Sequence, residues 1–377
     1  MAEPTAAPDP AIDELVLGLE RSLDDFVGDV GRTAPAVIVQ VTSPPLGLRW
    51  RGVRGTRSLD GDHALATDCF RIASVAKTFT AVSVLRLVEA GQLSIEDPVE
   101  AHLPDDLRSL FAGAIDESTR AGITVDRLLR HTSGVYDFGR DAEYARTVGR
   151  EPQHEWTAAE LVELALRRGP LVGAPGERFH YSDTGFTLLA GVVEQLTGTA
   201  LPLAYRHLVE FERLGLAHTW LEGREPAPDD GPVRLHQHLD GRDMYDLHPS
   251  CDTFGGGGLV STTDDLTRFV RALVAGDLLS ASLMDAMLRT DRETDLGELG
   301  AFAGQGIFRT PVAVLGRDGA PTGRHVDRLG HEGFWGVWMH HYPELDLTVA
   351  GTHTGVPIDD AARKRLLEAP VHLVATV

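Results

Sequence analysis

Ser74 and Lys77 lie three residues apart in the segment FRIASVAKTFT (70–80), and their side chains could together form an activated nucleophile. The chain contains two lysines in 377 residues, Lys77 and Lys364, and arginine supplies its other basic side chains apart from histidine. A lysine at position 77 is therefore unusual for this sequence. The residues after Ser74 are apolar on several faces, which predicts a buried helix with Ser74 in its first turn and Lys77 on the same face. Burial lowers the pKa of a lysine, so the amine could take the serine proton, while amides at the helix start favour negative charge.

Two later segments supply partners for such a nucleophile. FHYSDTGF places Tyr181 and Asp183 just before an expected helix, and LGHEGFWG places His331 and Gly333 on an expected strand. A tyrosine becomes a useful base only beside positive groups that favour phenolate, and Lys77 and His331 could supply them. Each residue alone is more often structural, because such tyrosines usually pack and strand histidines are usually satisfied within the core. Their order along the chain is what favours a catalytic role.

The order of these residues resembles the motifs of serine β-lactamases and penicillin-binding proteins, which are SxxK, then Tyr-x-Asn, then Lys- or His-x-Gly. The chain is most similar to the class C and esterase or D-aminopeptidase branch of that superfamily, and the resemblance extends over roughly residues 30 to 355. Further similar pieces are LLRHTSGV (128–135), GAPGERFHYSDTGF (173–186) and GGGLVSTTDDLTRF (256–269). His131 in the first of these is expected to fix a loop by hydrogen bonding.

The resemblance implies a role for each site residue. Ser74 would be the acylated nucleophile, and Lys77 with Tyr181 would move its proton. The backbone amides of Ser74 and Phe334 would form the oxyanion hole, and His331, standing where other members have lysine, would line the site and tune Tyr181. The expected substrate-binding residues are Asp183, Glu332, Gly333, Phe334 and Trp335.

Two acidic residues depart from the family pattern. Asp183 replaces an asparagine, and its carboxylate should stabilise the ammonium of Lys77 and leave more of the base role to Tyr181. Glu332 replaces a Thr or Ser that helps to bind the carboxylate of a β-lactam or peptide, so a Glu332 side chain facing the cleft would repel an anionic substrate. Penicillins are therefore poor candidates, and a substrate with a free amine would suit the two carboxylates.

The sequence therefore predicts a serine hydrolase that acts through an acyl-enzyme on small esters or amides, with amine-bearing, D-aminoacyl-type substrates among the candidates. A biosynthetic acyltransferase with the same acyl-enzyme is the alternative, since the motifs do not distinguish water from an amine as acceptor. A true β-lactamase, a D-Ala-D-Ala carboxypeptidase and a penicillin-binding sensor are less favoured. No metal or cofactor is expected, because HEGFW lacks the second histidine of a zinc protease helix and the histidines at 236–248 are typical of a polar loop.

The expected elements form an α+β fold of the β-lactamase/transpeptidase type. Residues 11–27 predict a helix, and residues 34–42 and 46–55 predict the two strands of an antiparallel hairpin. Helical patterns dominate from about 74 to 250, strand patterns return near 304, and a last helix follows from about 358 to 370. We therefore expect one antiparallel sheet formed by both termini and flanked by helices, a mainly helical lobe, and the active site between them.

Length and composition agree with a single catalytic domain spanning 1–377, with an α/β lobe at about 11–73 and 254–377 and a helical lobe at about 74–253. The 35 basic and 56 acidic residues give a net charge of −21, which opposes binding to nucleic acid or to an anionic membrane. The N-terminus lacks the pattern of an export signal, no apolar run is long enough to span a membrane, and two cysteines are too few for a disulfide scaffold. A cytoplasmic protein is expected, with a small ester or amide as its partner and an oligomeric state that the sequence leaves open.

Overall fold

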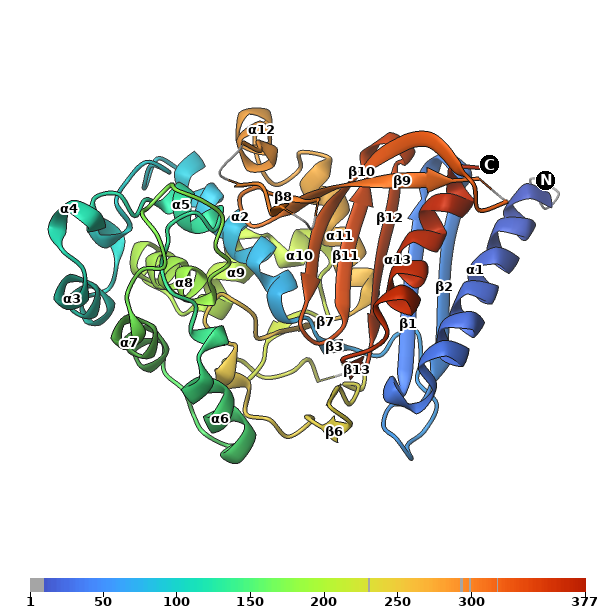
Figure 1. The fold of residues 1–377 in the computed structure, drawn as a ribbon, viewed down its shortest axis with the longest axis horizontal. Helices are drawn as coiled ribbons and strands as arrows, with labels where there is room; N and C mark the ends of the chain where they lie inside the picture. Colours follow the sequence, from blue (N-terminus) through green and yellow to red (C-terminus); the bar gives the residue numbers. More distant parts are fainter. Residues whose placement is uncertain (1–9, 230, 292–293, 298–299, 317) are drawn as a thin grey trace.

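The computed structural model describes residues 10–229, 231–291, 294–297, 300–316 and 318–377, which form a sheet-based part and a helical part (Figure 1). The central sheet has seven strands in the order β2-β1-β12-β11-β10-β9-β8, and neighbouring strands are antiparallel. The strands are β1 (Ala36–Ser43), β2 (Leu48–Gly55), β8 (Phe302–Ala303), β9 (Phe308–Leu315), β10 (Pro321–Gly333), β11 (Val337–Tyr342) and β12 (Leu347–His353). Because β1 pairs with β12, both ends of the chain build this sheet, and the predicted α+β fold is confirmed.

The two terminal helices, α1 (Pro10–Val30) and α13 (Asp360–Val374), lie side by side on one face of the sheet (Figure 1). Each has an apolar stripe that packs on alternate residues of the strands beneath it. Leu23 of α1 and Trp338 of β11 are fully buried between the two layers. Side chains of β10 and β11 that share the face of Trp338 therefore point toward these helices and away from the helical part.

The other face of the sheet contacts α11 (Thr263–Val274), whose first turn is capped by the side chain of Thr262 accepting from the amide of Asp265. Next to it lies α2 (Ala76–Glu89), in which ten consecutive residues beginning at Ala76 are buried. This matches the prediction of a helix that is apolar on nearly all sides. The helix cannot move without disturbing the core, so the groups at its first turn are held rigidly.

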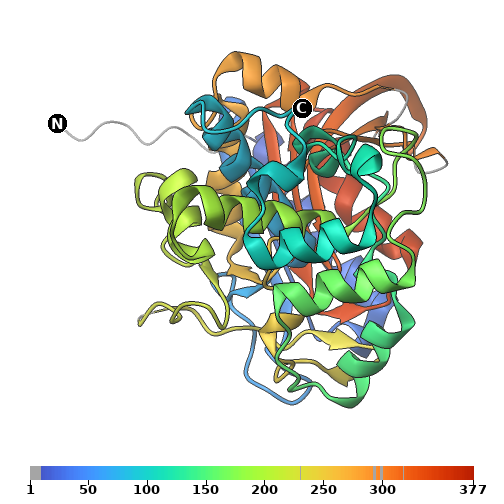
Figure 2. The same ribbon diagram turned by 90° about the vertical axis from the view of Figure 1, so that its left-hand side faces the viewer.

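The helical part surrounds α2, and Figure 2 looks onto it. Its helices are α3 (Asp105–Ala114), α4 (Glu117–Arg120), α5 (Val125–Leu129), α6 (Ala142–Arg150), α7 (Ala158–Arg168), α8 (Asp183–Thr197), α9 (Leu201–Leu208) and α10 (Phe211–Leu214), with α12 (Ala281–Leu288) beside them. Two small sheets have the orders β3-β7-β4 and β13-β5-β6. Their strands are β3 (Phe70–Arg71), β4 (Trp220–Leu221), β5 (His238–Leu239), β6 (Arg242–Asp243), β7 (Leu259–Ser261) and β13 (Gly355–Val356).

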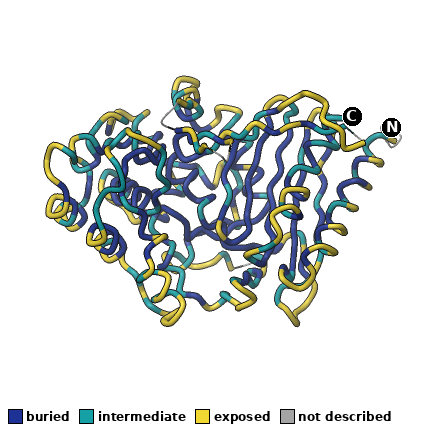
Figure 3. The backbone as a smooth tube through the Cα atoms, in the orientation of Figure 1, coloured by how far each residue is buried: buried dark blue, intermediate teal, exposed yellow. Residues whose placement is uncertain are grey.

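One apolar core joins the two parts, because α2, α8 and the inner face of β11 contribute to the same cluster of buried side chains. Figure 3 shows this buried interior running from the helical part into the sheet. The exact lobe boundaries expected from the sequence stay a prediction. Within the described residues, no single helix is long and apolar enough to cross a membrane, although α8 and α9 meet that test as a pair bent by 79°.

The predicted N-terminal hairpin is confirmed, with a 3-10 turn over Pro44–Leu46 and Gly47 in the left-handed region at φ 60°. The last helix is longer than the sequence suggested, since it continues through Pro370 to Val374. Proline removes one amide donor from the helix, and Pro370 is buried among the residues of the face that packs on the sheet.

Candidate active site

Ser74 lies in a 3-10 turn, Ala73–Val75, that leads directly into α2. The residue before it, Ala73, has φ 45°, a left-handed conformation that residues other than glycine rarely adopt. Such strained positions persist where the surroundings impose them and are frequent at active sites. The turn is half-buried at Ser74 and fully buried on both sides of it, so the hydroxyl is presented from a rigid support.

Lys77 is completely buried, and its Nζ donates to three oxygens. These are Ser74 Oγ at 3.1 Å, Asp183 Oδ1 at 2.5 Å and the carbonyl oxygen of Gly256 at 2.6 Å. Burial lowers the pKa of Lys77, but the negative charge of Asp183 and its hydrogen bond to Nζ help to raise it more, and the net shift is upward. The ammonium form is therefore favoured, as expected for an amine beside Asp183, and the fall in pKa expected from burial alone is wrong.

Tyr181 reaches the same place from the residues just before α8. Its ring stacks on the imidazole of His131 at 4.3 Å between centroids, and Lys77 Nζ lies 5.0 Å from the ring centroid. His131 in turn accepts a hydrogen bond at Nδ1 from the amide of Ser182, which confirms the predicted loop-fixing role. Burial raises the pKa of Tyr181, the charge of Lys77 lowers it, and the net shift is upward. A protonated phenol beside an ammonium is thus the resting arrangement.

His331 lies on β10 and faces the helical part, with its ring centroid 6.4 Å from that of Tyr181. Its Nδ1 lies 2.7 Å from the carbonyl oxygen of Glu332, so Nδ1 carries the proton and donates it. Burial and the nearby charge of Lys77 lower the pKa of His331 to about 3. The imidazole is therefore neutral near pH 7, and the expectation that it supplies positive charge to Tyr181 is wrong. Its buried Nε2 has no hydrogen-bond partner among the described residues.

The end of β10 approaches the nucleophile so closely that position 333 must be glycine. A Cβ on Gly333 would lie 2.3 Å from the carbonyl oxygen of Ile72. Phe334 follows with its ring 59% exposed, and Trp335 is buried with its ring 5.0 Å from that of Phe334. The close approach of Gly333 to Ile72 and Ala73 brings the backbone that leads into Phe334 beside the turn that carries Ser74, as the expected oxyanion hole requires.

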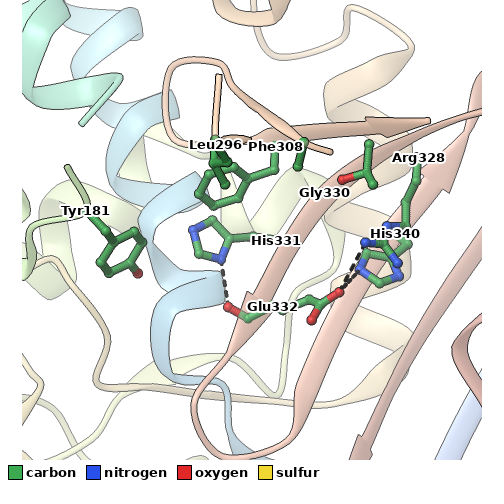
Figure 4. Close-up of a pocket in the computed structure, with 10 residues that line it drawn as sticks. Tyr181, Leu296, Phe308, Arg328, Gly330, His331, Glu332 and His340 are labelled. Atoms are coloured by element: carbon green, nitrogen blue, oxygen red, sulfur yellow. Dashed lines mark hydrogen bonds and ion pairs between the residues drawn. The ribbon is translucent and has the colours of Figure 1, made fainter. Parts of the chain in front are cut away.

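Glu332 points the other way from its neighbour His331, as Figure 4 shows. It is paired with Trp338 across the strands and shares the face covered by α13, where it contacts Arg363 at 2.5 Å and His340 at 3.3 Å. Burial would raise the pKa of Glu332, but the hydrogen bond from His340 and the charge of Arg363 hold it well below its usual range. The carboxylate is ionised and its charge is balanced. Glu332 nevertheless lines the same cavity as Tyr181 and His331, so its expected repulsion of anionic substrates stays a prediction, and the neighbouring arginines would weaken that repulsion.

A cavity of about 340 Å³ lies beside Tyr181 and His331 (Figure 4). Leu296 and Phe308 give it apolar surface, and Arg328 borders it at the far end from Tyr181 in Figure 4. Its volume suits a small acyl group or an amino acid side chain.

Two further carboxyl groups surround Lys77 and were missed from the sequence. Asp137 Oδ1 accepts hydrogen bonds from the amides of Asp183 and Gly139, both at 3.0 Å. Burial and the charge of Asp183 raise the pKa of Asp137 to about 6. Burial raises the pKa of Asp252 to about 7, against the charge of Lys77. Only a weak sign of these two residues is present in the sequence. Each aspartate lies one or two positions before a Phe-Gly pair in a loop, a pattern that does not indicate contact with Lys77.

The structure thus brings Ser74, Lys77, Tyr181, His331 and Asp183 together. Glu332 lies on the opposite face of β10 from His331 but lines the same cavity. Metal-binding clusters of three or more histidine, cysteine or acidic side chains are not found in the described ranges. The histidine-rich loop instead contains an isolated pair between His236 and Asp243, 2.6 Å apart.

The chain matches the family model described as Beta-lactamase over residues 19–372. Among curated proteins it is similar to an uncharacterised protein of Mycobacterium tuberculosis, with 30% identity over 66% of either chain. It is also similar to the esterase EstB of Burkholderia gladioli, with 28% identity over 77% of this chain and 78% of EstB.

Among solved structures, the D-stereospecific amidohydrolase of a Streptomyces species aligns with a TM-score of 0.75 and 27% identity over 96% of this chain and 98% of its own. The D-amino acid amidase of Ochrobactrum anthropi SV3 aligns with a TM-score of 0.75, over 96% of this chain and 97% of its own. Its identity is 23%, so this likeness shows the fold alone.

Proposed function

Because the chain belongs to the beta-lactamase family, a family of serine hydrolases, we propose that it hydrolyses small esters or amides through an acyl-enzyme formed on Ser74. The observation that carries the proposal is the buried Nζ of Lys77, 3.1 Å from Ser74 Oγ at the start of α2. Burying a lysine completely is costly unless it is paired and hydrogen-bonded, and Lys77 is held by Asp183 and by the carbonyl oxygen of Gly256. Here it contacts the hydroxyl that family relatives would use as nucleophile.

In the proposed acylation, Ser74 Oγ attacks the carbonyl carbon of the substrate and gives its proton to the Lys77–Tyr181 pair. At rest this pair holds both of its protons, so the active form is the one that has lost a single proton. The phenolate of Tyr181 is the better base of the two, because the ammonium of Lys77 is stabilised by Asp183. The amides of Ser74 and Phe334 would bind the negative oxygen that develops.

Breakdown follows the same route in reverse. Tyr181 returns the proton to the departing alkoxide or amine, which leaves an ester between Ser74 and the acyl group. Water then attacks this ester, giving a proton to Tyr181, and the acid is released as Ser74 recovers its proton. His331 is neutral and contributes an acceptor nitrogen at the edge of the cavity, which suits a hydrogen bond from the substrate.

The carboxyl groups around Lys77 favour a substrate that carries a free amine. The carboxylate of Asp183 keeps 23% of its side chain exposed, and Asp137 and Asp252 lie behind it, so three carboxyl groups surround the one ammonium of Lys77. A substrate ammonium would be attracted to this wall. The structural similarity to an amidohydrolase that is named as D-stereospecific supports amino acid amides or esters as candidates.

The first experiment is an assay of p-nitrophenyl esters, D- and L-amino acid amides and nitrocefin, with Ser74→Ala compared against Ser83→Ala. Ser83 is a matched control, because it is buried in the same helix and donates to the carbonyl oxygen of Phe79. Ser74→Ala should abolish turnover and Ser83→Ala should keep it. Turnover by Ser74→Ala at the wild-type rate would refute the acyl-enzyme at this residue.

The same assay addresses the alternative of acyl transfer. An amine added as a second acceptor would be converted to an amide product if the chain is an acyltransferase, and acid would remain the main product if it is a hydrolase. Both outcomes depend on Ser74, so the control variants remain the same.

A further inference from the structure

Gln237 lies immediately before β5, outside every segment that resembles the family motifs, and its side chain is 3% exposed. Its carboxamide makes three hydrogen bonds with backbone groups. Oε1 accepts from the amide of Arg71 at 3.0 Å, and Nε2 donates to the carbonyl oxygens of Arg71 at 3.0 Å and Trp335 at 3.2 Å. One side chain therefore ties β3 to the turn between β10 and β11.

These two segments carry the two amides of the proposed oxyanion hole. Arg71 is three residues before Ser74, and Trp335 is directly after Phe334. A pair of backbone donors stabilises a developing oxyanion only if both are held at the right separation before the reaction begins. The segments also touch directly at Gly333 and Ile72, but that contact is steric and sets only how near they come. Gln237 adds the directional bonds.

The side chain of Arg71 is also held in place, so the end of the Gln237 bridge that lies on β3 has a fixed position. Its buried guanidinium donates to the carbonyl oxygens of Met244 and Leu247 and pairs with Glu222 at 2.6 Å. The guanidinium thus holds β3 from the other side. The turn containing Phe334 and Trp335 is closed by a backbone hydrogen bond from the amide of Gly336 to the carbonyl oxygen of Gly333 at 3.0 Å, and the bond from Gln237 Nε2 to the carbonyl oxygen of Trp335 ties this closed turn to β3.

We infer that Gln237 is a positioning residue for the oxyanion hole, one that fixes the amide of Phe334 relative to that of Ser74 by bridging Arg71 and Trp335. This inference rests on the proposed acyl-enzyme chemistry. The bridge needs one acceptor and two donors on the same planar group, which a glutamine amide supplies. A methionine of similar length supplies neither, and an ionised glutamate supplies only acceptors.

The test compares Gln237→Met with Gln40→Met. Gln40 on β1 is a matched control, because it is 1% exposed and its Oε1 accepts from Arg51 at 2.8 Å and Thr263 at 3.2 Å. Two strands, β12 and β11, separate β1 from β10, the strand that leads into Phe334. For each variant, kcat and KM are measured with a p-nitrophenyl ester, together with the affinity for a boronic acid and for the carboxylic acid product. The boronic acid adds to the serine oxygen and forms a tetrahedral anion that resembles the reaction intermediate.

Gln237→Met should lower kcat by about tenfold to a hundredfold and change KM by less than about twofold, because an oxyanion donor acts mainly in the transition state. Affinity for the boronic acid should fall by a similar factor, and affinity for the product acid should stay nearly constant. Compared with wild type at the same pH, Gln237→Glu should lose less kcat at acid pH than at neutral pH, because the protonated carboxyl group again has one donor.

Three results separate the inference from the function on which it rests. If Gln237→Met and Gln40→Met lose kcat equally, or if product and boronic acid affinities fall together, Gln237 has only a general structural role and the inference is overturned. If Ser74→Ala stays active, the proposed function fails first. An inactive Ser74→Ala combined with a fully active Gln237→Met would overturn the positioning role alone.

Discussion

The two walls of the active site handle charge in opposite ways. On the wall formed by α2 and the start of α8, carboxyl groups gather around Lys77 at the centre, and the raised pKa values of Asp137 and Asp252 reflect the crowding of negative charge as well as burial. On the sheet wall, the buried imidazoles His331 and His340 are neutral, and the carboxylate of Glu332 is balanced by arginines.

This difference shows that a residue's position in a motif does not determine its electrostatic role. Asp183 and Glu332 both replace neutral residues of the family pattern, yet only Asp183 projects toward the nucleophile. The alternation of side chains along β10 sends Glu332 to the opposite face from His331. We therefore assign substrate charge preference to the helical wall and hydrogen bonding and shape to the sheet wall.

The largest expected effect is on the helical wall. Tyr181→Phe and Lys77→Met should each lower kcat by about a hundredfold or more, since a general base contributes about that much. His331→Gln on the sheet wall should cost about tenfold or less, because a neutral acceptor is replaced by another. Steady-state kinetics with one ester, alongside circular dichroism to verify folding, makes the comparison. Equal losses at Tyr181 and His331 would erase the distinction between the walls.

Stability should depend on pH with opposite signs at the two walls. The pKa of His340 is lowered by burial to about 4, so its contribution is complete above its ordinary pKa of 6.5 and is lost as pH falls toward 4. The raised pKa of Asp252, about 7, gives a contribution that is lost as pH rises from about 4 through 7.

Urea unfolding between pH 8 and 4 measures the contributions of His340 and Asp252 to the free energy of unfolding. Replacing His340 by Gln should reduce the loss of stability below pH 6.5 by on the order of 2 kcal/mol. Asp252→Asn should instead flatten the change between pH 4 and 7. Identical pH profiles for wild type and His340→Gln would show that this imidazole is not kept neutral by the fold.

A smaller stability effect is expected at Glu332. Glu332→Gln leaves Arg363 and Arg328 without their shared anion, and it should cost about 1–2 kcal/mol, because 32% of the carboxylate side chain remains exposed to water. The midpoint of urea unfolding with an unchanged slope gives the value. A stability equal to that of wild type would mean that these ion pairs contribute nothing in solution.

The sequence predicted the sheet built from both termini, the buried helix and the contact of Ser74 with Lys77, because these depend on periodicity and on spacing within one helical turn. It also led to Tyr181 and His331 through their order in the chain. It could not give the direction of the Glu332 side chain, which depends on which face of β10 meets α13. Nor could it find Asp137 and Asp252, whose contact with the Lys77 group depends on the folding of two separate loops. The cytoplasmic location stays a prediction.

Asp183 also sets the pH at which the base forms. Because its charge raises the pKa values of both Tyr181 and Lys77, Asp183→Asn should move the rising limb of the kcat/KM profile toward lower pH. The profile from pH 5 to 10 for wild type and variant tests this directly. An unshifted limb would mean that the proton lost on activation does not belong to the Lys77–Tyr181 pair.

The central claim is that the helical wall selects an amine and the sheet wall does not. The measurement is kcat/KM for a matched pair of esters, one with a free amine and one without, in wild type, Asp183→Asn and Glu332→Gln. Wild type should prefer the amine, Asp183→Asn should reduce that preference by about tenfold, and Glu332→Gln should leave it within about twofold. A preference that survives Asp183→Asn and falls with Glu332→Gln would contradict the account.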